Sequence, residues 1–564
     1  MDVNFRYLGR SGMIDSGGSR ILKMAPNLDR DKVAFDAQLK APLRFREAIS
    51  ALHDVVINDL TFQPRDKTAY QEWKQAQYQR EQRIRQDAEK AKTNEIARTG
   101  IQKPPASLKN DYALAKKRYW HSRRQLNEWL RKNDKTLWRK LMPYDPVITV
   151  ADDVLMFECF SADESSYGCL SVDRDCFGHA NEVCKGTTNV DYSWELYDNF
   201  QSLRSYRETR FNINPEGFQV RTESQSDYHE EKIELPDGWL RGFMSLQSAM
   251  GLPMRKVSLS TGAVYSLLAF LKRNKAKTSP RAIRFELADG KSPRLVLEPW
   301  EKEIQSKGTI YRGPSDEPIR VWGRRRLLTL TRLLPLADRF DVYLLGTGLP
   351  SFWVAKMGNM RLTLGLSGWT NNDWTRGSAV QMLLPPQQPS DALVAETAKA
   401  LNHARSMQLA EIAAGAKVTV DEMAGALNQL ALRGQTIYDL DADRFRWRQV
   451  LPMAISDREV GQGHPEQIAA REILLRGQIK IQSQQKGPRG GAILTADVAH
   501  MNCEVLVADD GMIRNGKCGC RWHHKFGIRN GPCQHLQALR DAYLKRGESL
   551  GNDWYQNRMK WAGR

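Results

Sequence analysis

The feature that most constrains this chain is a group of cysteine and histidine residues in its last tenth. A Cys-Gly-Cys tripeptide is followed by twelve residues and then by Cys-Gln-His, which gives the four candidate metal ligands Cys518, Cys520, Cys533 and His535. Zn²⁺ binds three thiolates and one imidazole in a tetrahedron. Four protein ligands leave no position for a water molecule, so the spacing predicts a structural zinc site.

The choice of histidine leaves an alternative. His523 and His524 lie inside the twelve-residue spacer and are the other candidates for the fourth ligand. His535 is preferred because it stands at the start of a predicted helix, in which Leu536 and Leu539 recur at helical spacing. A second alternative is that the cysteines are buried thiols without a metal.

The spacing of these ligands resembles the SWIM zinc-finger family. The stretches EVLVADD and GMIRNGK before Cys518 resemble the β-hairpin that precedes the finger in that family. The resemblance implies a module that binds DNA or proteins, with DNA favoured over RNA, and that does no chemistry. Lys525 and Arg529 lie in the spacer and are candidate nucleic-acid contacts.

A wider resemblance covers most of residues 140–564. Stretches such as ESSYGCLSVD (164–173), RSYRETRF (204–211) and VWGRRRLLTLTRLLPLADRFDVYLLGTG (321–348) are similar to bacterial SWIM-finger proteins found alongside MoxR-type AAA+ ATPases and von Willebrand A-domain proteins. This resemblance implies an adaptor or recognition subunit of such an ATPase system. It leaves the arm at 65–141 unaccounted for.

Composition, and the positions of glycine and proline between short apolar runs, predict a multidomain α+β protein. The expected parts are a small mixed segment (1–64) that pairs with something further on, a charged helical arm (65–141), a central β-rich α+β domain (142–385), a helical, winged-helix-like segment (391–455) and the SWIM zinc-finger module (460–564). In the arm, helices are expected at 71–99 and 111–140. Further helices are expected at Gly262–Arg273, Arg324–Leu336 and 391–414.

The charge balance favours an anionic partner. The chain has 84 Lys and Arg against 66 Asp and Glu, a net charge of +18, which suits nucleic acid or acidic protein surfaces. The predicted helix 111–140 interleaves basic residues with tryptophans, as in single-strand binders, and supplies the candidate contacts Lys116, Lys117, Arg123, Arg124 and Arg131. The alternative is a solvated helix whose tryptophans pack on the central domain.

Residues 418–451 predict a helix, a turn at Gly434 and two short strands, as at the end of a winged helix. Arg433, Arg446 and Arg448 lie near the expected wing and are candidate DNA contacts, although such units also dock proteins. Arg324–Arg326 are expected at the solvated end of an amphipathic helix, with a weaker hypothesis of anion binding there.

Catalysis finds little support, so we expect a protein that is not an enzyme. The chain lacks G-x-x-x-x-G-K-[ST], H-E-x-x-H and G-x-S-x-G. A metal-dependent nuclease using Asp163, Glu164 and Asp173 is the least favoured alternative. The spacings of Cys159, Cys169, Cys176 and Cys184 match no zinc knuckle and predict ordinary buried thiols.

The sequence also predicts a compartment. The N-terminus MDVNFRYLGRSGM shows no signal-peptide pattern, and no run of apolar residues approaches the 18 that span a membrane. Eight cysteines in 564 residues are too few for a disulfide framework. We therefore expect a cytoplasmic protein with no membrane contact.

Overall fold

The computed structural model confirms a mixed α+β protein. It describes residues 2–3, 6–7, 11–57, 146–213, 228–229, 233–234, 239–368, 389–450 and 465–564, apart from gaps at 17–18, 28–31, 162–164, 179, 191–193, 279, 316, 488–490, 509–510, 529–530 and 547–552, together with single helical positions between 111 and 133. Contacts divide the chain into two compact units, one formed by Met1–Leu60 with Tyr144–Arg564 and the other by Thr61–Pro143.

The second unit contains the predicted helix at 111–140. Its described positions from Asp111 to Asn133 are helical and exposed, and they include Leu114, Leu126 and Trp129, of which the last is 57% exposed. The predicted helix at 71–99 lies outside the described residues. Among the described helices, none is long and apolar enough to cross a membrane.

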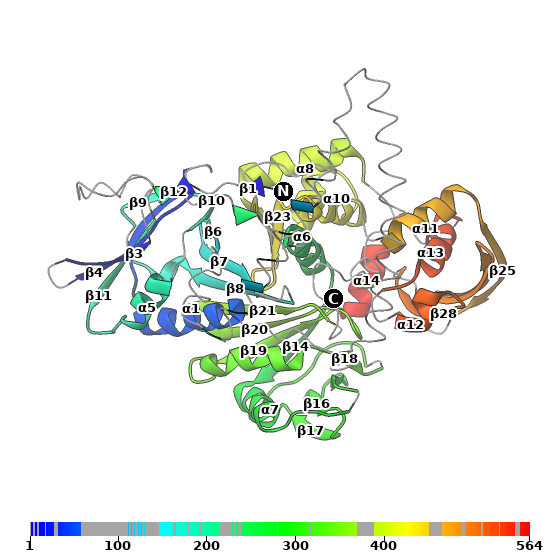
Figure 1. Cartoon of the computed structure of the whole chain (residues 1–564), viewed down its shortest axis with the longest axis horizontal. Coiled ribbons are helices and arrows are strands. Elements are labelled where there is room, and N and C mark those ends of the chain that lie inside the picture. Colours follow the sequence, from blue (N-terminus) through cyan, green and yellow to red (C-terminus); the bar gives the residue numbers. More distant parts are fainter. Residues whose placement is uncertain are drawn as a thin grey trace, which may run out of the picture. The chain divides into compact units, whose positions relative to one another are not determined.

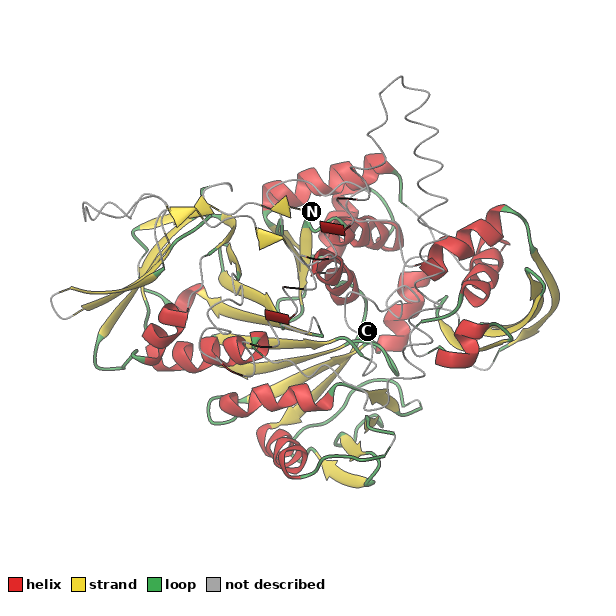
Figure 2. Ribbon diagram, in the orientation of Figure 1, coloured by secondary structure: helices red, strands yellow, loops and turns green. Residues whose placement is uncertain are grey.

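An antiparallel eight-stranded sheet forms the centre of the first unit (Figures 1 and 2). Its order is β10-β6-β7-β8-β21-β20-β19-β14, with bounds β6 Val147–Val150, β7 Val154–Phe160, β8 Ser166–Asp173, β10 Gly186–Asn189, β14 Arg255–Ser260, β19 Arg339–Leu344, β20 Ser351–Met357 and β21 Met360–Leu366. Strands β7 and β21 are buried along their whole length, so both faces of the sheet are covered there. Helix α1 (Pro42–Val56) packs against β7, β8 and β21.

The N-terminal segment pairs with later strands, as predicted. A five-stranded sheet has the order β3-β4-β11-β5-β9, with bounds β3 Gly12–Ser16, β4 Ser19–Met24, β5 Ala34–Gln38, β9 Glu182–Cys184 and β11 Glu208–Ile213. Strand β11 runs parallel to β4 and antiparallel to β5. Two short antiparallel ladders join β1 (Asp2–Val3) to β13 (Ile233–Glu234) and β2 (Arg6–Tyr7) to β12 (Tyr228–His229). Helix α5 (Trp194–Gln201) packs on α1.

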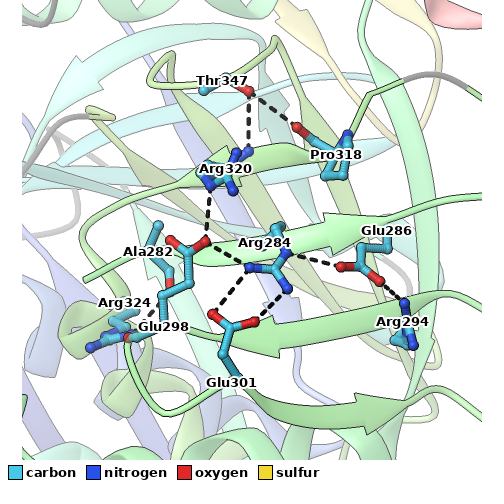
Figure 3. A network of polar contacts seen from close by, with 10 residues as sticks. All are labelled: Ala282, Arg284, Glu286, Arg294, Glu298, Glu301, Pro318, Arg320, Arg324 and Thr347. Atoms are coloured by element: carbon cyan, nitrogen blue, oxygen red, sulfur yellow. Dashed lines mark hydrogen bonds and ion pairs between the residues drawn. The ribbon is translucent and has the colours of Figure 1, made fainter. Parts of the chain in front are cut away.

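A small four-stranded sheet is inserted after α7 (Thr261–Arg273), the helix predicted at Gly262–Arg273. Its order is β17-β16-β15-β18, with bounds β15 Ile283–Glu286, β16 Arg294–Leu297, β17 Lys302–Gln305 and β18 Ile319–Val321. The buried carboxylate of Glu298 accepts from Arg284 Nη1 and Arg320 Nε, both at 2.9 Å (Figure 3). Arg284 also contacts Glu286 and Glu301, so one carboxylate and one guanidinium tie β15, β18 and the turn after β16 together.

The solvated helix expected at Arg324–Leu336 is wrong in two respects. The segment is a 3₁₀-helix (η2, Arg324–Leu333), and Arg324 and Arg326 are 5% and 8% exposed. Arg324 donates to the carbonyl oxygens of Ala282 and Glu298 (Figure 3). Its guanidinium lies over the Trp300 ring. A buried arginine that satisfies backbone carbonyls is a structural group, so Arg324 is not available to an anion, whereas Arg325 is exposed.

Replacing Glu298 by glutamine is expected to lower the free energy of unfolding by about 1–3 kcal/mol, because two arginines lose a charged acceptor that is 2% exposed. Denaturant titration measures this change. Glu303→Gln is the control, since Glu303 is 59% exposed and its ion pair with Arg294 lies in solvent. It should change stability by less than about 0.5 kcal/mol. Equal effects for both variants would contradict a structural role for Glu298.

The segment predicted as winged-helix-like has three helices and a three-stranded sheet. The order is α8 (Asp391–Ala404), β22 (Ser406–Met407), α9 (Leu409–Ala416), α10 (Val420–Leu432), β23 (Thr436–Asp439) and β24 (Arg444–Trp447), with β24 between β22 and β23. The single helix expected at 391–414 is therefore wrong. Arg405, at φ 63°, ends α8, and Gln408 with Glu411 forms a capping box that starts α9.

Helix α10 is enclosed. Nine of its residues are buried, it packs on α6 (Trp239–Met250), α8 and α9, and Asn428 Nδ2 donates to Ser248 Oγ at 2.7 Å. Its sequence, VDEMAGALNQLAL, carries no basic residue. A helix of this kind cannot enter a DNA groove, because its faces are covered by the same chain and it offers no cation to phosphates.

The C-terminal module is larger than a hairpin with one helix. An antiparallel sheet of β25 (Ile479–Lys486), β26 (Ala492–Val498), β27 (Met501–Val507) and β28 (Ile513–Cys518) packs with α11 (Pro465–Leu475), α12 (Arg521–Phe526) and α13 (Gln534–Arg546). The predicted hairpin is β27 and β28. Helix α14 (Trp554–Ala562) packs against α10 and β14.

Candidate metal centre

The four predicted ligands meet where β28 gives way to two helices. Cys518 is the last residue of β28, and Cys520 caps α12, where its Sγ accepts from the backbone N–H of His523. Cys533 directly precedes α13, and His535 is the second residue of that helix. Leu536 and Leu539, both fully buried, hold α13 against the sheet, so hydrophobic packing places the last two ligands.

The ligand atoms converge as a metal site requires. One donor atom from each of Cys518, Cys520, Cys533 and His535 lies within 4.8 Å of all the others. Cys518 Sγ and His535 Nδ1 are 3.6 Å apart. A tetrahedral Zn²⁺ with bonds of about 2.3 Å to sulfur and 2.0–2.1 Å to nitrogen holds two such ligands about 3.6 Å apart. The residues therefore fit a metal ion in both donor chemistry and spacing.

The surroundings favour a thiolate at Cys518. Hydrogen bonds with the thiols of Cys503, Cys520 and Cys533 hold the pKa of Cys518 well below its usual value. Burial lowers the pKa of His535, but hydrogen bonds to Cys518 and Cys520 outweigh burial and raise it to about 9. Both shifts favour charged side chains at the site, and a metal ion would bind in place of the proton on His535.

Residues behind the ligands fix the start of α13. Glu466 on α11 is 2% exposed, and its Oε2 accepts from the backbone N–H of Gln534 at 2.9 Å. A carboxylate at a helix N-terminus satisfies one of the free backbone donors and complements the helix dipole. The Gln534 side chain lies 3.4 Å from Nε2 of His535, which leaves Nδ1 facing the cysteines.

The structure resolves the choice of histidine in favour of His535. His524 is exposed, and neither His523 nor His524 belongs to the group of converging donors. One neighbouring thiol was missed by the sequence analysis. Cys503 lies directly opposite Cys518 in the β27–β28 ladder, and its thiol donates to Cys518 Sγ at 3.6 Å. The alternation of apolar and polar residues along β27 was a signal that Cys503 is buried, because it places Cys503 on the same face as Val505 and Val507.

Two of the predicted nucleic-acid contacts are wrong. Arg446 and Arg448 are 2% and 0% exposed, so neither side chain reaches a phosphate. Arg446 forms a two-pronged ion pair with Asp153, at 2.6 and 2.7 Å, and another with Asp439. Arg448 Nη2 donates to the fully buried Glu158 at 2.5 Å. The side chains of Arg446 and Arg448 therefore face Asp153 and Glu158 instead of solvent.

The other predicted contacts are distributed unevenly. Lys525 is exposed on α12, with its ammonium 5.4 Å from the centre of the Phe526 ring. Arg433 is half-buried and lies 3.8 Å from Asp391. The remaining candidates, Lys116, Lys117, Arg123, Arg124, Arg131 and Arg529, lie outside the described residues.

The alternative cysteine group does not assemble into a metal site, and of the nuclease candidates only Asp173 lies among the described residues. In the described part of the chain, only the C-terminal group brings three or more ligand atoms within 4.8 Å. Cys159 and Cys169 are buried on β7 and β8, Cys176 is buried in the 3₁₀-turn η1 (Arg174–Cys176), and Cys184 is half-buried on β9. Asp173 pairs with Arg361 at 2.6 Å, whereas Asp163 and Glu164 lie outside the described residues.

The Asp153–Arg446 pair predicts a pH effect. A hydrogen bond from Arg446, opposed by partial burial, lowers the pKa of Asp153. A depressed carboxyl pKa adds stability above the unfolded value of 3.8, and this contribution is lost as pH falls through the folded pKa. Asp153→Asn should cost about 1 kcal/mol or less at pH 7, since Asp153 is half exposed, and the difference from wild type should vanish in acid. A difference that grows towards acid would contradict this.

Comparisons with known proteins add no family. No family model and no curated protein matches the chain. Among solved structures it is similar to the proliferating cellular nuclear antigen of Entamoeba histolytica (12% identity, TM-score 0.26, 41% of this chain and 91% of that one). Similar values relate it to A. fulgidus PCNA bound to the FEN-1 C-terminal region (14%, 0.27, 40% and 89%) and to the PCNA2–PCNA3 complex of Sulfolobus tokodaii (10%, 0.27, 40% and 90%). TM-scores this low carry no argument about fold or function.

Proposed function

We propose that this chain is a zinc-containing binding protein that recognises an anionic partner, with nucleic acid favoured and DNA favoured over RNA. The observation that carries the proposal is the convergence of Cys518, Cys520, Cys533 and His535. Zn²⁺ is the ion that suits three thiolates and an imidazole, and four protein ligands leave no position for a reacting water. The ion would hold β28, α12 and α13 together, which is a structural role and not a catalytic one.

The contact surface that we assign is α12, which follows the first two ligands. Arg521, His524 and Lys525 are exposed on this helix, and Lys517 precedes it at 77% exposure. The half-buried Trp522 and Phe526 rings pack at 4.8 Å between centroids beside these residues. Cations beside aromatic rings suit phosphates and unstacked bases. Because Cys520 caps α12, loss of the metal would disorder this surface.

Fluorescence anisotropy with labelled single- and double-stranded DNA and RNA across a salt series tests the proposal. We expect binding that weakens steeply with salt, because each neutralised phosphate releases counterions. The double variant Arg521→Gln/Lys525→Gln should weaken binding about tenfold or more. The slope of log affinity against log salt concentration should fall by the amount expected for the loss of about two phosphate contacts. Lys291→Gln/Lys307→Gln is the charge-matched control, since both lysines are exposed in turns next to strands of the small sheet. Equal losses in both double variants would reject α12 as the contact surface.

A protein-only adaptor is the second candidate, and the burial of Arg446 and Arg448 favours it over the DNA-binding winged helix. The sequence resemblance to SWIM proteins makes a MoxR-type AAA+ ATPase, with its von Willebrand A-domain protein, the partner to test. Absence of nucleic-acid binding even at low salt, together with co-purification of that ATPase, would support this candidate. Binding to nucleic acid that depends on α12 would reject it.

A further inference from the structure

A fifth cysteine borders the metal centre without belonging to it. Cys503 on β27 is 4% exposed, and it is the direct cross-strand partner of Cys518 on β28. Its Sγ lies 3.6 Å from Cys518 Sγ, but it stands outside the group of four donor atoms that all lie within 4.8 Å of one another. Cys503 therefore contacts Cys518, one of the four candidate ligands. A metal ion bound by those four residues would leave the Cys503 thiol uncoordinated and able to react.

We propose that Cys503 and Cys518 form a reversible cross-strand disulfide when a peroxide oxidises the zinc module. This inference rests on the zinc site of the proposed function and assigns it a mode of regulation. Directly opposite residues of an antiparallel ladder have Cα separations of about 4.5–5.5 Å, within the range that a disulfide spans. Closing the gap from 3.6 Å to a bond of about 2.05 Å requires each sulfur to move by less than about 1 Å.

The chemistry balances with hydrogen peroxide as the oxidant. The Cys518 thiolate attacks one peroxide oxygen, the O–O bond breaks, and hydroxide leaves a sulfenic acid on Cys518. The Cys503 sulfur then attacks the Cys518 sulfur, the S–O bond breaks, and water departs with the Cys503 proton. Two cysteine sulfurs are oxidised and one peroxide is reduced to water and hydroxide.

The position of Cys503 selects it as the resolving thiol. A bound metal would engage the lone pairs of Cys520, Cys533 and His535 in coordination, whereas the Cys503 thiol points at Cys518. The disulfide removes one of four ligands, so the remaining three would bind zinc more weakly. The same bond protects Cys518 from further oxidation to the sulfinic acid, which thiols do not reverse.

The test uses the full-length protein, hydrogen peroxide and three chains: wild type, Cys503→Ala and Cys169→Ala. Cys169 is a matched control, because it is a buried strand cysteine, 3% exposed, that lies outside the metal centre. Alanine suits both sites because a buried thiol packs like a small apolar group. Before oxidation, zinc content and thermal midpoint should be the same in all three, which shows that the variants fold.

After peroxide, wild type and Cys169→Ala should release zinc and show a linked peptide pair. Trypsin separates the two cysteines, because Arg514 and Lys517 lie between them. Dithiothreitol with added zinc should then restore full zinc content. Cys503→Ala should instead accumulate sulfinic acid at Cys518 and recover less than about half of its zinc.

Two outcomes would overturn the inference: links only among Cys518, Cys520 and Cys533 in wild type, or equal zinc recovery in Cys503→Ala. Both leave the proposed function standing if the untreated protein contains zinc. Untreated protein without zinc would instead refute the proposed function, while a Cys503–Cys518 link would still establish the oxidisable pair.

Discussion

Replacing Cys533 by serine is expected to unfold the C-terminal module and to leave the central sheet intact. Cys533 is fully buried, and its thiolate would be one of four bonds to the ion. Structural zinc contributes roughly 10–16 kcal/mol in isolated zinc fingers, so loss of one ligand should remove several kcal/mol. Hydrogen exchange should therefore accelerate in β25–β28 and α13, while β19, β20 and β21 keep their protection. Chelation of wild-type zinc should give the same pattern.

The control for this variant is Cys169→Ser, which introduces the same change into β8. Its cost should be that of burying one hydroxyl, about 1–3 kcal/mol, with zinc content and module protection unchanged. Full protection of residues 465–546 after complete metal removal would contradict the structural role. That result would mean that hydrophobic packing of Leu536 and Leu539 holds α13 without the ion.

The second large effect is expected at the buried Glu158–Arg448 pair. Both side chains are 0% exposed, their closest N–O distance is 2.5 Å, and the Tyr167 hydroxyl donates to the same Glu158 oxygen. Arg448→Met leaves a carboxylate in the core without its cation, so it should cost about 3–5 kcal/mol in the free energy of unfolding. Equilibrium denaturation, followed by tryptophan fluorescence, measures this.

Two further variants make the expectation specific. Arg476→Met removes an exposed cation whose partner Glu472 lies 3.7 Å away, and it should cost less than about 0.5 kcal/mol. Adding Glu158→Gln to Arg448→Met should recover part of the loss, because no charge then remains buried. A cost below about 1 kcal/mol for Arg448→Met, or a double variant less stable than it, would contradict the assigned pair.

The metal centre could be predicted from the sequence because its constraint is local. Four ligands within eighteen residues define a site almost independently of the fold, and the helix that carries His535 follows from the spacing of Leu536 and Leu539. Cys503 was missed because it reaches the site across a strand pair, and pairing register is not visible in one sequence. The ladder partner of a ligand becomes evident only once β27 and β28 are aligned.

The misplaced arginines show where local patterns fail. Arg446 alternates with Phe445 and Trp447 on β24, which favours a solvent-facing arginine when only the strand is considered. The partner of Arg446 is Asp153, which lies 293 residues away in the sequence. The partner of Arg448 is Glu158, which lies 290 residues away. One signal was present: Glu158 interrupts the apolar run VLMFECF, and a buried carboxylate requires a cation.

We propose that Cys518, Cys520, Cys533 and His535 hold one tetrahedral metal ion. The most direct measurement is metal analysis of the purified chain by mass spectrometry, followed by exchange with Co²⁺ and its absorption spectrum. We predict one zinc per chain, and strong visible Co²⁺ bands with thiolate charge transfer that weaken in Cys533→Ser. A metal-free protein that remains folded, or the weak bands of six-coordinate Co²⁺, would contradict a tetrahedral site made of these four residues.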